Sequence, residues 1–232
     1  MIATYIFGAL SLVLCIVFCI FRSKKASVGS LALKTAASLA FVLCGLFGIN
    51  ATASNTATLL IIAGLVFGLV GDIVLDLKIM YPTQSNHYFV TGTGAFAIGH
   101  IFYFVATLLL NKVALPSHLL ANILISLGVA VVLTLAIMLP SKKLGLNFGS
   151  MLWVCAGYSL MLTFMMAFAI SIAIYIPIFW IFAAGMILFF LSDLVLSMQY
   201  FGGKTQKSLI YINHILYYLA QICIAISIFY IL

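Results

Sequence analysis

Acidic side chains are nearly absent from this sequence, which contains three aspartates and no glutamate among 232 residues. Charged residues of either sign make up only 6%, whereas 66% are hydrophobic and the mean hydropathy is +1.36. This composition excludes a soluble globular domain and indicates that the bilayer is the solvent. The net charge of +7 does not indicate nucleic-acid binding, because the basic residues occur in ones and twos between apolar runs.

Signals for a cleaved leader or a disulfide framework are also missing. No basic residue precedes the apolar run 2–21 and no small-residue cleavage site follows it, so we expect a retained first span. The five cysteines lie within apolar segments at spacings that do not suit a metal, which favours a packing role.

Eight apolar runs are each about long enough to cross the hydrocarbon core, which takes roughly 20 helical residues. They cover residues 2–21, 30–49, 57–77, 88–110, 118–139, 148–170, 176–198 and 209–231. The connections between them are too short for a soluble domain. We therefore predict an all-α membrane protein, a bundle of eight transmembrane helices forming one domain over residues 1–232.

The basic residues are distributed very unevenly between the two sides of this bundle. One side carries Arg22, Lys24, Lys25, Lys34, Lys78, Lys142, Lys143, Lys204 and Lys207, and the other carries Lys112. The positive-inside rule then predicts cytoplasmic odd-to-even connections and both termini outside. In a bacterial cell this would be the inner membrane.

Every carboxylate lies inside a predicted span. Asp72 and Asp76 belong to GLVFGLVGDIVLDLK, from Gly64 to Lys78, and Asp193 lies in GMILFFLSDLVLSMQ. A carboxylate in the membrane costs at least a few kcal/mol, so Asp72 and Asp193 are candidates for a functional site. Asp76 is close to Lys78 at the helix end, where an exposed or snorkelling pair is the alternative to a role in chemistry.

The chain also repeats itself weakly. GDIVL around Asp72 matches SDLVL around Asp193, and GHIFYFVA around His100 matches NHILYYLA around His214. The offset of four helices predicts two parallel repeats, residues 1–112 and 113–232, with the two aspartates facing each other. The glycines of TGTGAFAIG (91–99) are interpreted as small residues that permit close helix approach.

Two carboxylates in a low-dielectric cleft do not both ionise easily, so one proton is expected to be shared. The neutral acid and its ionised partner could then serve as general acid and general base. A proton relay in a small-molecule or lipid transporter would use the same residues. A metal-dependent lipid hydrolase using Asp72, Asp193 and the two histidines is a third alternative, although no pair shows local ligand spacing.

Two signatures in the chain resemble those of the YhhN-like lysoplasmalogenase family. The first runs from Gly71 and Asp72 through F89-x-x-G-x-x-x-F-x-x-G-H-x-x-Y103, and the second runs from Gly185 through Ser192-Asp193 to Tyr217-Tyr218-x-Ala-Gln221. Together they cover about half of the chain. The family's Lys-Pro on the second span is Lys34-Thr35 here.

This resemblance implies an intramembrane hydrolase that cleaves the vinyl-ether bond of lysoplasmalogens, with Asp72 and Asp193 as acid and base and without a cofactor or metal. The substrate would be a single-chain ether lysophospholipid with its head near the cytoplasmic boundary and its tail between the third, fourth, seventh and eighth spans. Lys34 could meet its phosphate or snorkel. The expected substrate-binding residues are Lys34, His100, Tyr103, Tyr158, Ser192, Asn213, Tyr217, Tyr218 and Gln221.

Overall fold

A computed structural model describes residues 2–49, 56–204 and 206–231 of the chain. Within these residues there are eight long helices and no strand: α1 (Ile2–Arg22), α2 (Val28–Leu46), α3 (Thr56–Met80), α4 (Ser85–Ala114), α5 (Leu119–Met138), α6 (Leu152–Tyr175), α7 (Trp180–Tyr200) and α8 (Lys207–Ile231). All eight are long and apolar enough to cross a membrane. The predicted all-α class and the eight spans are confirmed.

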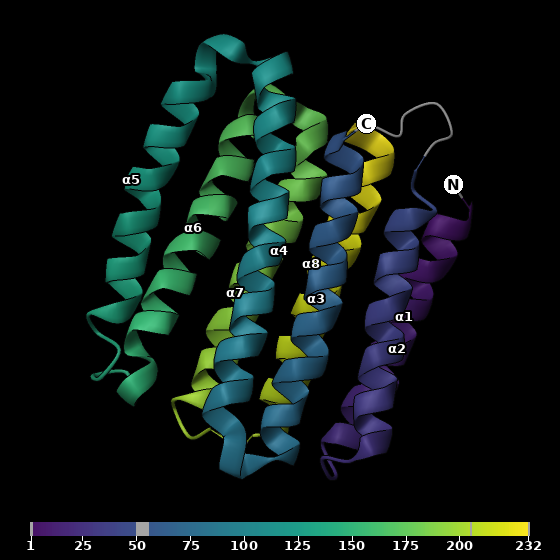
Figure 1. Ribbon diagram of the computed structural model, residues 1–232, viewed down its shortest axis with the longest axis vertical. Coiled ribbons are helices and arrows are strands. Elements are labelled where there is room, and N and C mark those ends of the chain that lie inside the picture. The colour runs from purple at the N-terminus through teal and green to yellow at the C-terminus, as the bar shows by residue number, and fades with distance from the viewer. Residues whose placement is uncertain (1, 50–55, 205, 232) are drawn as a thin grey trace.

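The helices form an up-and-down bundle in which neighbours in sequence pack as antiparallel pairs (Figure 1). The pairs are α1 with α2, α3 with α4, α5 with α6, and α7 with α8. Helix α8 also contacts α1, α2 and α3, which closes the bundle, whereas α5 lies at the edge and packs mainly on α6. Both chain ends lie at the same end of the bundle (Figure 1).

Close packing of α3 on α4 depends on glycine. A Cβ added at Gly64 would overlap the Tyr103 ring, and one at Gly99 would lie 3.0 Å from the Gly64 carbonyl oxygen. Gly92 leaves room for Leu75 in the same way. These contacts confirm that glycines of the 91–99 stretch serve helix approach. Gly94, in contrast, faces open space.

Local signals fix the helix ends. Ser27 caps α2 and forms a capping box with Ser30, in which each side chain bonds the other residue's backbone N–H at 3.2 and 3.0 Å. Pro82, Pro116 and Pro177 each begin a short 3₁₀ turn ahead of the next helix, where a missing N–H costs little.

Several helix ends that carry polar residues meet at the end of the bundle away from the termini. The last turns of α1, α3 and α7 lie there, together with the first turns of α2 and α8. Buried polar side chains in this half include Arg22, Lys34, Asp72, Asp76 and Asn213. The fold therefore brings buried charged side chains from α1, α2 and α3 together with a polar side chain from α8.

Candidate active site

Four buried charged side chains form a connected group, which we call the charge cluster: Arg22, Lys34, Asp72 and Asp76. The Lys34 ammonium lies 3.3 Å from Asp72 Oδ1 and 3.6 Å from Asp76 Oδ1. The Arg22 guanidinium lies 2.9 Å from Asp76 Oδ2. Because two cations face two carboxylates, the cluster is neutral overall and can exist away from water.

The charge cluster corrects two expectations. Asp76 is only 1% exposed and is paired with Arg22 and Lys34, so the alternative of an exposed pair with Lys78 is wrong. Lys78 instead places its ammonium 3.7 Å from the centre of the Tyr200 ring, where it makes a cation–π contact. Lys34 is 6% exposed and does not snorkel to the membrane surface.

On each of two helices, a pair of residues four positions apart in sequence contributes to the charge cluster and its hydrogen bonds. Asp72 and Asp76 lie on one face of α3, and Lys34 and Ser38 lie on one face of α2. The Ser38 hydroxyl donates to Asp72 Oδ2 over 2.6 Å, and the Tyr218 hydroxyl lies 2.9 Å from the Ser38 oxygen. Tyr218 also donates to the Lys34 carbonyl oxygen at 3.1 Å. These bonds hold the Asp72 carboxylate in one orientation.

The charge cluster borders a cavity of about 360 Å³, called here the polar cavity. Asp72 and Asp193 both line it, so the two carboxylates predicted to act together share one space. The remaining polar lining comprises Arg22, Lys34, Asp76, Ser192, Gln199, Tyr200, Lys204, Gln206, Asn213, His214 and Tyr217.

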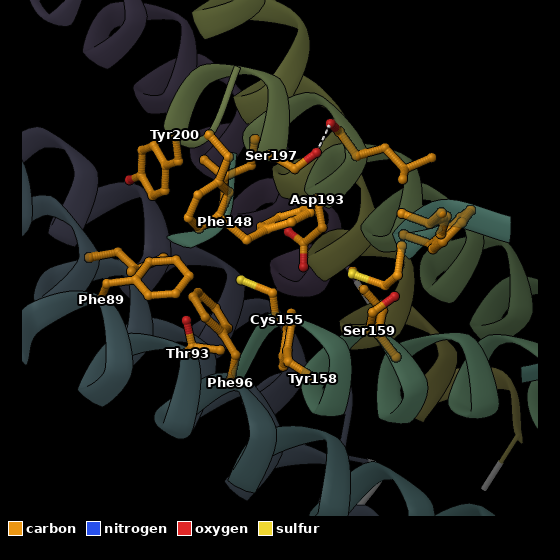
Figure 2. Close-up of a pocket in the computed structure, with 18 residues that line it drawn as sticks. Phe89, Thr93, Phe96, Phe148, Cys155, Tyr158, Ser159, Asp193, Ser197 and Tyr200 are labelled. Carbon is orange, nitrogen blue, oxygen red and sulfur yellow. Dashed lines mark hydrogen bonds between the residues drawn. The ribbon is translucent and has the colours of Figure 1, made fainter. Parts of the chain in front are cut away.

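Asp193 differs from Asp72 in its surroundings. It forms no ion pair with any residue in the described part of the chain, and it is partly exposed to the cavities. Its carboxyl also lies on the wall of a second, apolar cavity, which Tyr158 lines as well (Figure 2). Asp193 thus stands between a charged space and an apolar one.

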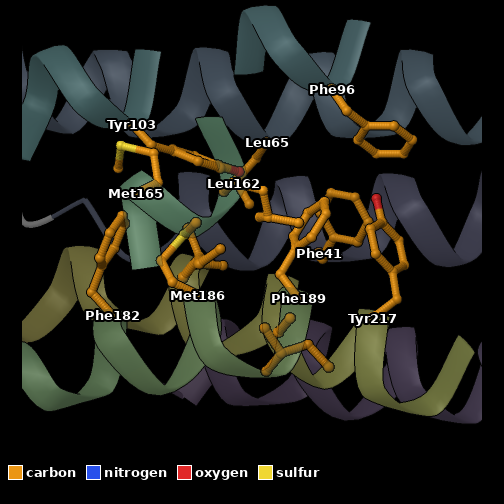
Figure 3. Packing of buried hydrophobic residues seen from close by; sticks show 14 of the residues in the cluster. Phe41, Leu65, Phe96, Tyr103, Leu162, Met165, Phe182, Met186, Phe189 and Tyr217 are labelled. Carbon is orange, nitrogen blue, oxygen red and sulfur yellow. The ribbon is translucent and has the colours of Figure 1, made fainter. Parts of the chain in front are cut away.

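Three aromatic rings pack together next to the polar cavity, and those of Phe96 and Tyr217 belong to its lining. Phe96 of α4, Phe189 of α7 and Tyr217 of α8 meet edge to face, with ring centres 5.4 to 5.9 Å apart (Figure 3). Edge-to-face packing of this kind favours a fixed geometry.

The other predicted site residues fall into two groups. Asn213 donates to the Ser192 carbonyl oxygen at 2.8 Å and lies 3.1 Å from its hydroxyl, and both residues line the polar cavity, as does Tyr217. Behind them, Gln221 donates to the Tyr217 hydroxyl at 2.9 Å and accepts from Tyr103 at 3.2 Å. The structure therefore places Gln221, Tyr103 and Tyr218 in a supporting network rather than on the wall of either cavity.

His100 also lies behind the walls of these two cavities. Its Nδ1 bonds the Phe96 carbonyl oxygen at 2.8 Å, and its ring packs against Phe189 at 4.8 Å. His214, its counterpart in the predicted repeat, makes the same bond to the residue four positions earlier, Ile210, at 2.7 Å, but lines the polar cavity. The two histidines thus differ in their access to the site.

Sequence reasoning missed Arg22, Ser38 and the pairing of Asp76. The spacing of four between Asp72 and Asp76, repeated by Lys34 and Ser38, could have indicated one shared face on each helix. No sequence signal connects Arg22 with Asp76, which lies 54 positions later.

Fold and site together define a multi-pass helical membrane protein that encloses a charged cavity, lined by the carboxyl groups of Asp72, Asp76 and Asp193, in one half of the bundle. The chain belongs to the YhhN family, whose sequence profile matches residues 29–228. This confirms the resemblance inferred from the two signatures. No curated protein and no solved structure matches the chain.

Proposed function

We propose that this protein is an intramembrane hydrolase that cleaves the vinyl-ether bond of lysoplasmalogens and releases a fatty aldehyde and a glycerophospho-alcohol. The observation that carries the proposal is that Asp72 and Asp193 line one cavity but differ in their surroundings. Of these two residues, Asp72 has a cation beside it, the Lys34 ammonium, and Asp193 has none among the described residues. Membership of the YhhN family is consistent with this activity.

The unequal surroundings assign different roles to the two carboxyl groups. Asp72 has Lys34 at 3.3 Å and accepts a hydrogen bond from Ser38, and both contacts favour the ionised form. Asp193 lacks an ion pair among the described residues and borders the apolar cavity, which favours the neutral acid. We assign Asp193 as the general acid and Asp72 as the ionised partner.

The reaction follows from these roles. Asp193 gives its proton to the β-carbon of the vinyl ether. The electron pair of the double bond forms the new C–H bond, and an oxocarbenium-like cation remains, shared by the α-carbon and the ether oxygen. Asp72 stabilises this cation and orients a water molecule, which adds to the α-carbon and returns a proton to Asp193. The hemiacetal then collapses: its C–O bond breaks, the hydroxyl proton passes to the leaving oxygen, and the aldehyde forms. Glycosidases divide labour between two carboxyl groups in a similar way.

The substrate would approach from the bilayer as a single-chain ether lysophospholipid. Its head would face the end of the bundle that carries nine of the ten basic residues, the cytoplasmic end according to the positive-inside rule. Lys204 and Arg22 line the polar cavity and are suited to an anionic phosphate.

The test is aldehyde release from a purified lysoplasmalogen by the purified protein in lipid nanodiscs. The matched control substrate has a saturated ether in place of the vinyl ether and cannot be protonated at carbon, so it should stay intact. Activity that survives a chelator supports the Asp/Asp mechanism, whereas activity lost with the chelator supports the metal-dependent alternative. Absence of aldehyde together with proton flux in proteoliposomes would favour the transporter and reject the enzyme.

A further inference from the structure

The polar and apolar cavities meet at a short list of residues. The side chains that line both are Leu75, Phe96, Asp193, Leu196 and Tyr200. Asp193 is the one carboxyl group among them. A molecule that reached from one cavity into the other would pass this carboxyl.

The two cavities differ in chemistry and in the helices that build them. The polar cavity is lined mainly from α1, α2, α3, α7 and α8 and carries the charge cluster. The apolar cavity lies among α4, the end of α5, α6 and α7, and most of its wall is aromatic or aliphatic (Figure 2). Such a division suits an amphiphile with a charged head and an alkyl tail.

We infer that the apolar cavity is the tail subsite, so that the substrate lies across Asp193 with its tail beside α6 and its head in the polar cavity. This inference rests on the proposed function. It moves the tail away from the position expected from the sequence, between the third, fourth, seventh and eighth spans, and gives a substrate-binding role to α5 and α6.

The direction of the vinyl ether supports this placement. The β-carbon, which accepts the proton, bears the alkyl tail, and the ether oxygen bears the head. A tail in the apolar cavity places the β-carbon on the side of Asp193 and directs the oxygen toward the polar cavity, where Asp72 lies. The general acid, Asp193, then lies beside the carbon that accepts the proton. The ionised partner, Asp72, lies toward the ether oxygen, where the positive charge develops.

The tail cannot fit entirely inside the bundle. The apolar cavity has a volume of about 90 Å³, less than the ~150 Å³ cavity that accepts a benzene molecule. It can hold the first few carbons. The half-buried residues Ile137, Phe190 and Leu194 on its wall offer a route between α5 and α7 by which the remaining carbons stay in the lipid.

Two residues on one face of α6 are placed to select the tail. Ser159 and Leu162, three positions apart, both line the apolar cavity. Leu162 is buried, whereas Ser159 is half-buried, so a larger side chain at Ser159 can fill the cavity mouth with less risk to folding. Gly157, on the same helix, is exposed and faces open space, which makes it a matched control position.

The kinetic test compares Ser159→Phe with Gly157→Phe on lysoplasmalogens that share one head group and carry tails of increasing length. Ser159→Phe should lower kcat/KM for long tails about tenfold or more, since small changes in an apolar pocket have effects of this order. The Gly157→Phe protein should keep the wild-type chain-length profile. If Ser159→Phe fails to fold, Ser159→Leu carries the same expectation with a smaller change. A chain-length profile unchanged by Ser159→Phe or Ser159→Leu would overturn the assignment.

Cross-linking tests the subsite without depending on turnover. A single-chain lysolipid with a saturated ether and a diazirine near the start of its tail is photolysed on the wild-type protein, and the labelled peptides are identified by mass spectrometry. Labels on α5 and α6 support the tail subsite even if no vinyl ether is cleaved, whereas labels confined to α3 and α8 contradict it. Labelling of α5 and α6 without aldehyde release would reject the proposed reaction and keep the lipid site.

Discussion

The Lys34 ammonium lies 3.3 Å from Asp72 Oδ1, and both side chains are buried. Helix α2 therefore supplies a cation beside a carboxyl group of α3 inside an apolar bundle. A buried ion remains charged only when a partner offsets the cost of removing it from water. Asp193 has no ion pair within the described ranges, so the two carboxyl groups should respond differently to the same substitution.

Asp193→Asn should reduce turnover by ~10²–10⁴-fold, because Asn preserves the shape of the side chain but cannot donate a proton. Asp72→Asn should cause a loss of similar size, because it removes the negative charge that stabilises the cation. Only Asp72→Asn should also lower the thermal unfolding midpoint, since it removes a partner of Lys34. Aldehyde release and thermal unfolding of the two purified variants check this pair of effects. Near-wild-type turnover by either variant would show that its aspartate is structural.

Lys34→Met should lower kcat rather than only raise KM. Loss of the ammonium withdraws the charge that favours ionised Asp72, whereas a residue that only held the head group would change KM alone. The double variant Lys34→Met/Asp72→Asn should regain part of the stability lost by Lys34→Met, without regaining activity. Steady-state kinetics and unfolding midpoints for the four proteins of this cycle give the coupling between the two residues.

Asp76→Asn should destabilise the fold more than it affects chemistry, because it leaves the Arg22 guanidinium buried with a neutral partner. Breaking a buried pair in this way costs roughly 3–5 kcal/mol. Replacing both residues, as Arg22→Met/Asp76→Met, should restore much of the stability while the Lys34–Asp72 pair remains. If Asp76→Asn abolishes turnover in a protein of normal stability, Asp76 belongs to the chemistry.

Gly64→Ala should be clearly destabilising, by about 1–3 kcal/mol, because its methyl group would overlap the Tyr103 ring. Gly94→Ala is the matched control, a helix glycine that faces open space. It should be neutral or stabilising by up to ~1 kcal/mol, since Ala is the better helix former. Equal unfolding midpoints for the two variants would contradict the close approach of α3 to α4.

Much of the fold could be predicted because the membrane leaves few alternatives. Each apolar run of sufficient length must become a helix, since the bilayer interior satisfies no backbone hydrogen bond. Short connections then force antiparallel neighbours. Asp72 and Asp193 are predicted as site residues for a similar reason, because a carboxylate inside a membrane span is costly.

The pairing of Asp76 and the apolar cavity could not be predicted from the sequence, because both depend on contacts between helices that are distant in the chain. Asp76 was misassigned because Lys78 is its near neighbour in sequence, although the Lys78 side chain turns to the Tyr200 ring instead. The true partner, Arg22, reaches Asp76 only once α1 has packed onto the bundle. The apolar cavity likewise requires side chains from α3 to α7 and has no local signature.

The family profile begins at residue 29, after α1 has ended at Arg22. A chain cut at the boundary of the profile would therefore lose the guanidinium of Arg22. Lys34 would then be the one cation left beside both Asp72 and Asp76 in the charge cluster. The charge cluster of this protein thus extends beyond the segment by which its family is recognised. The first helix, outside that segment, supplies the counter-ion that balances the charges next to the cavity.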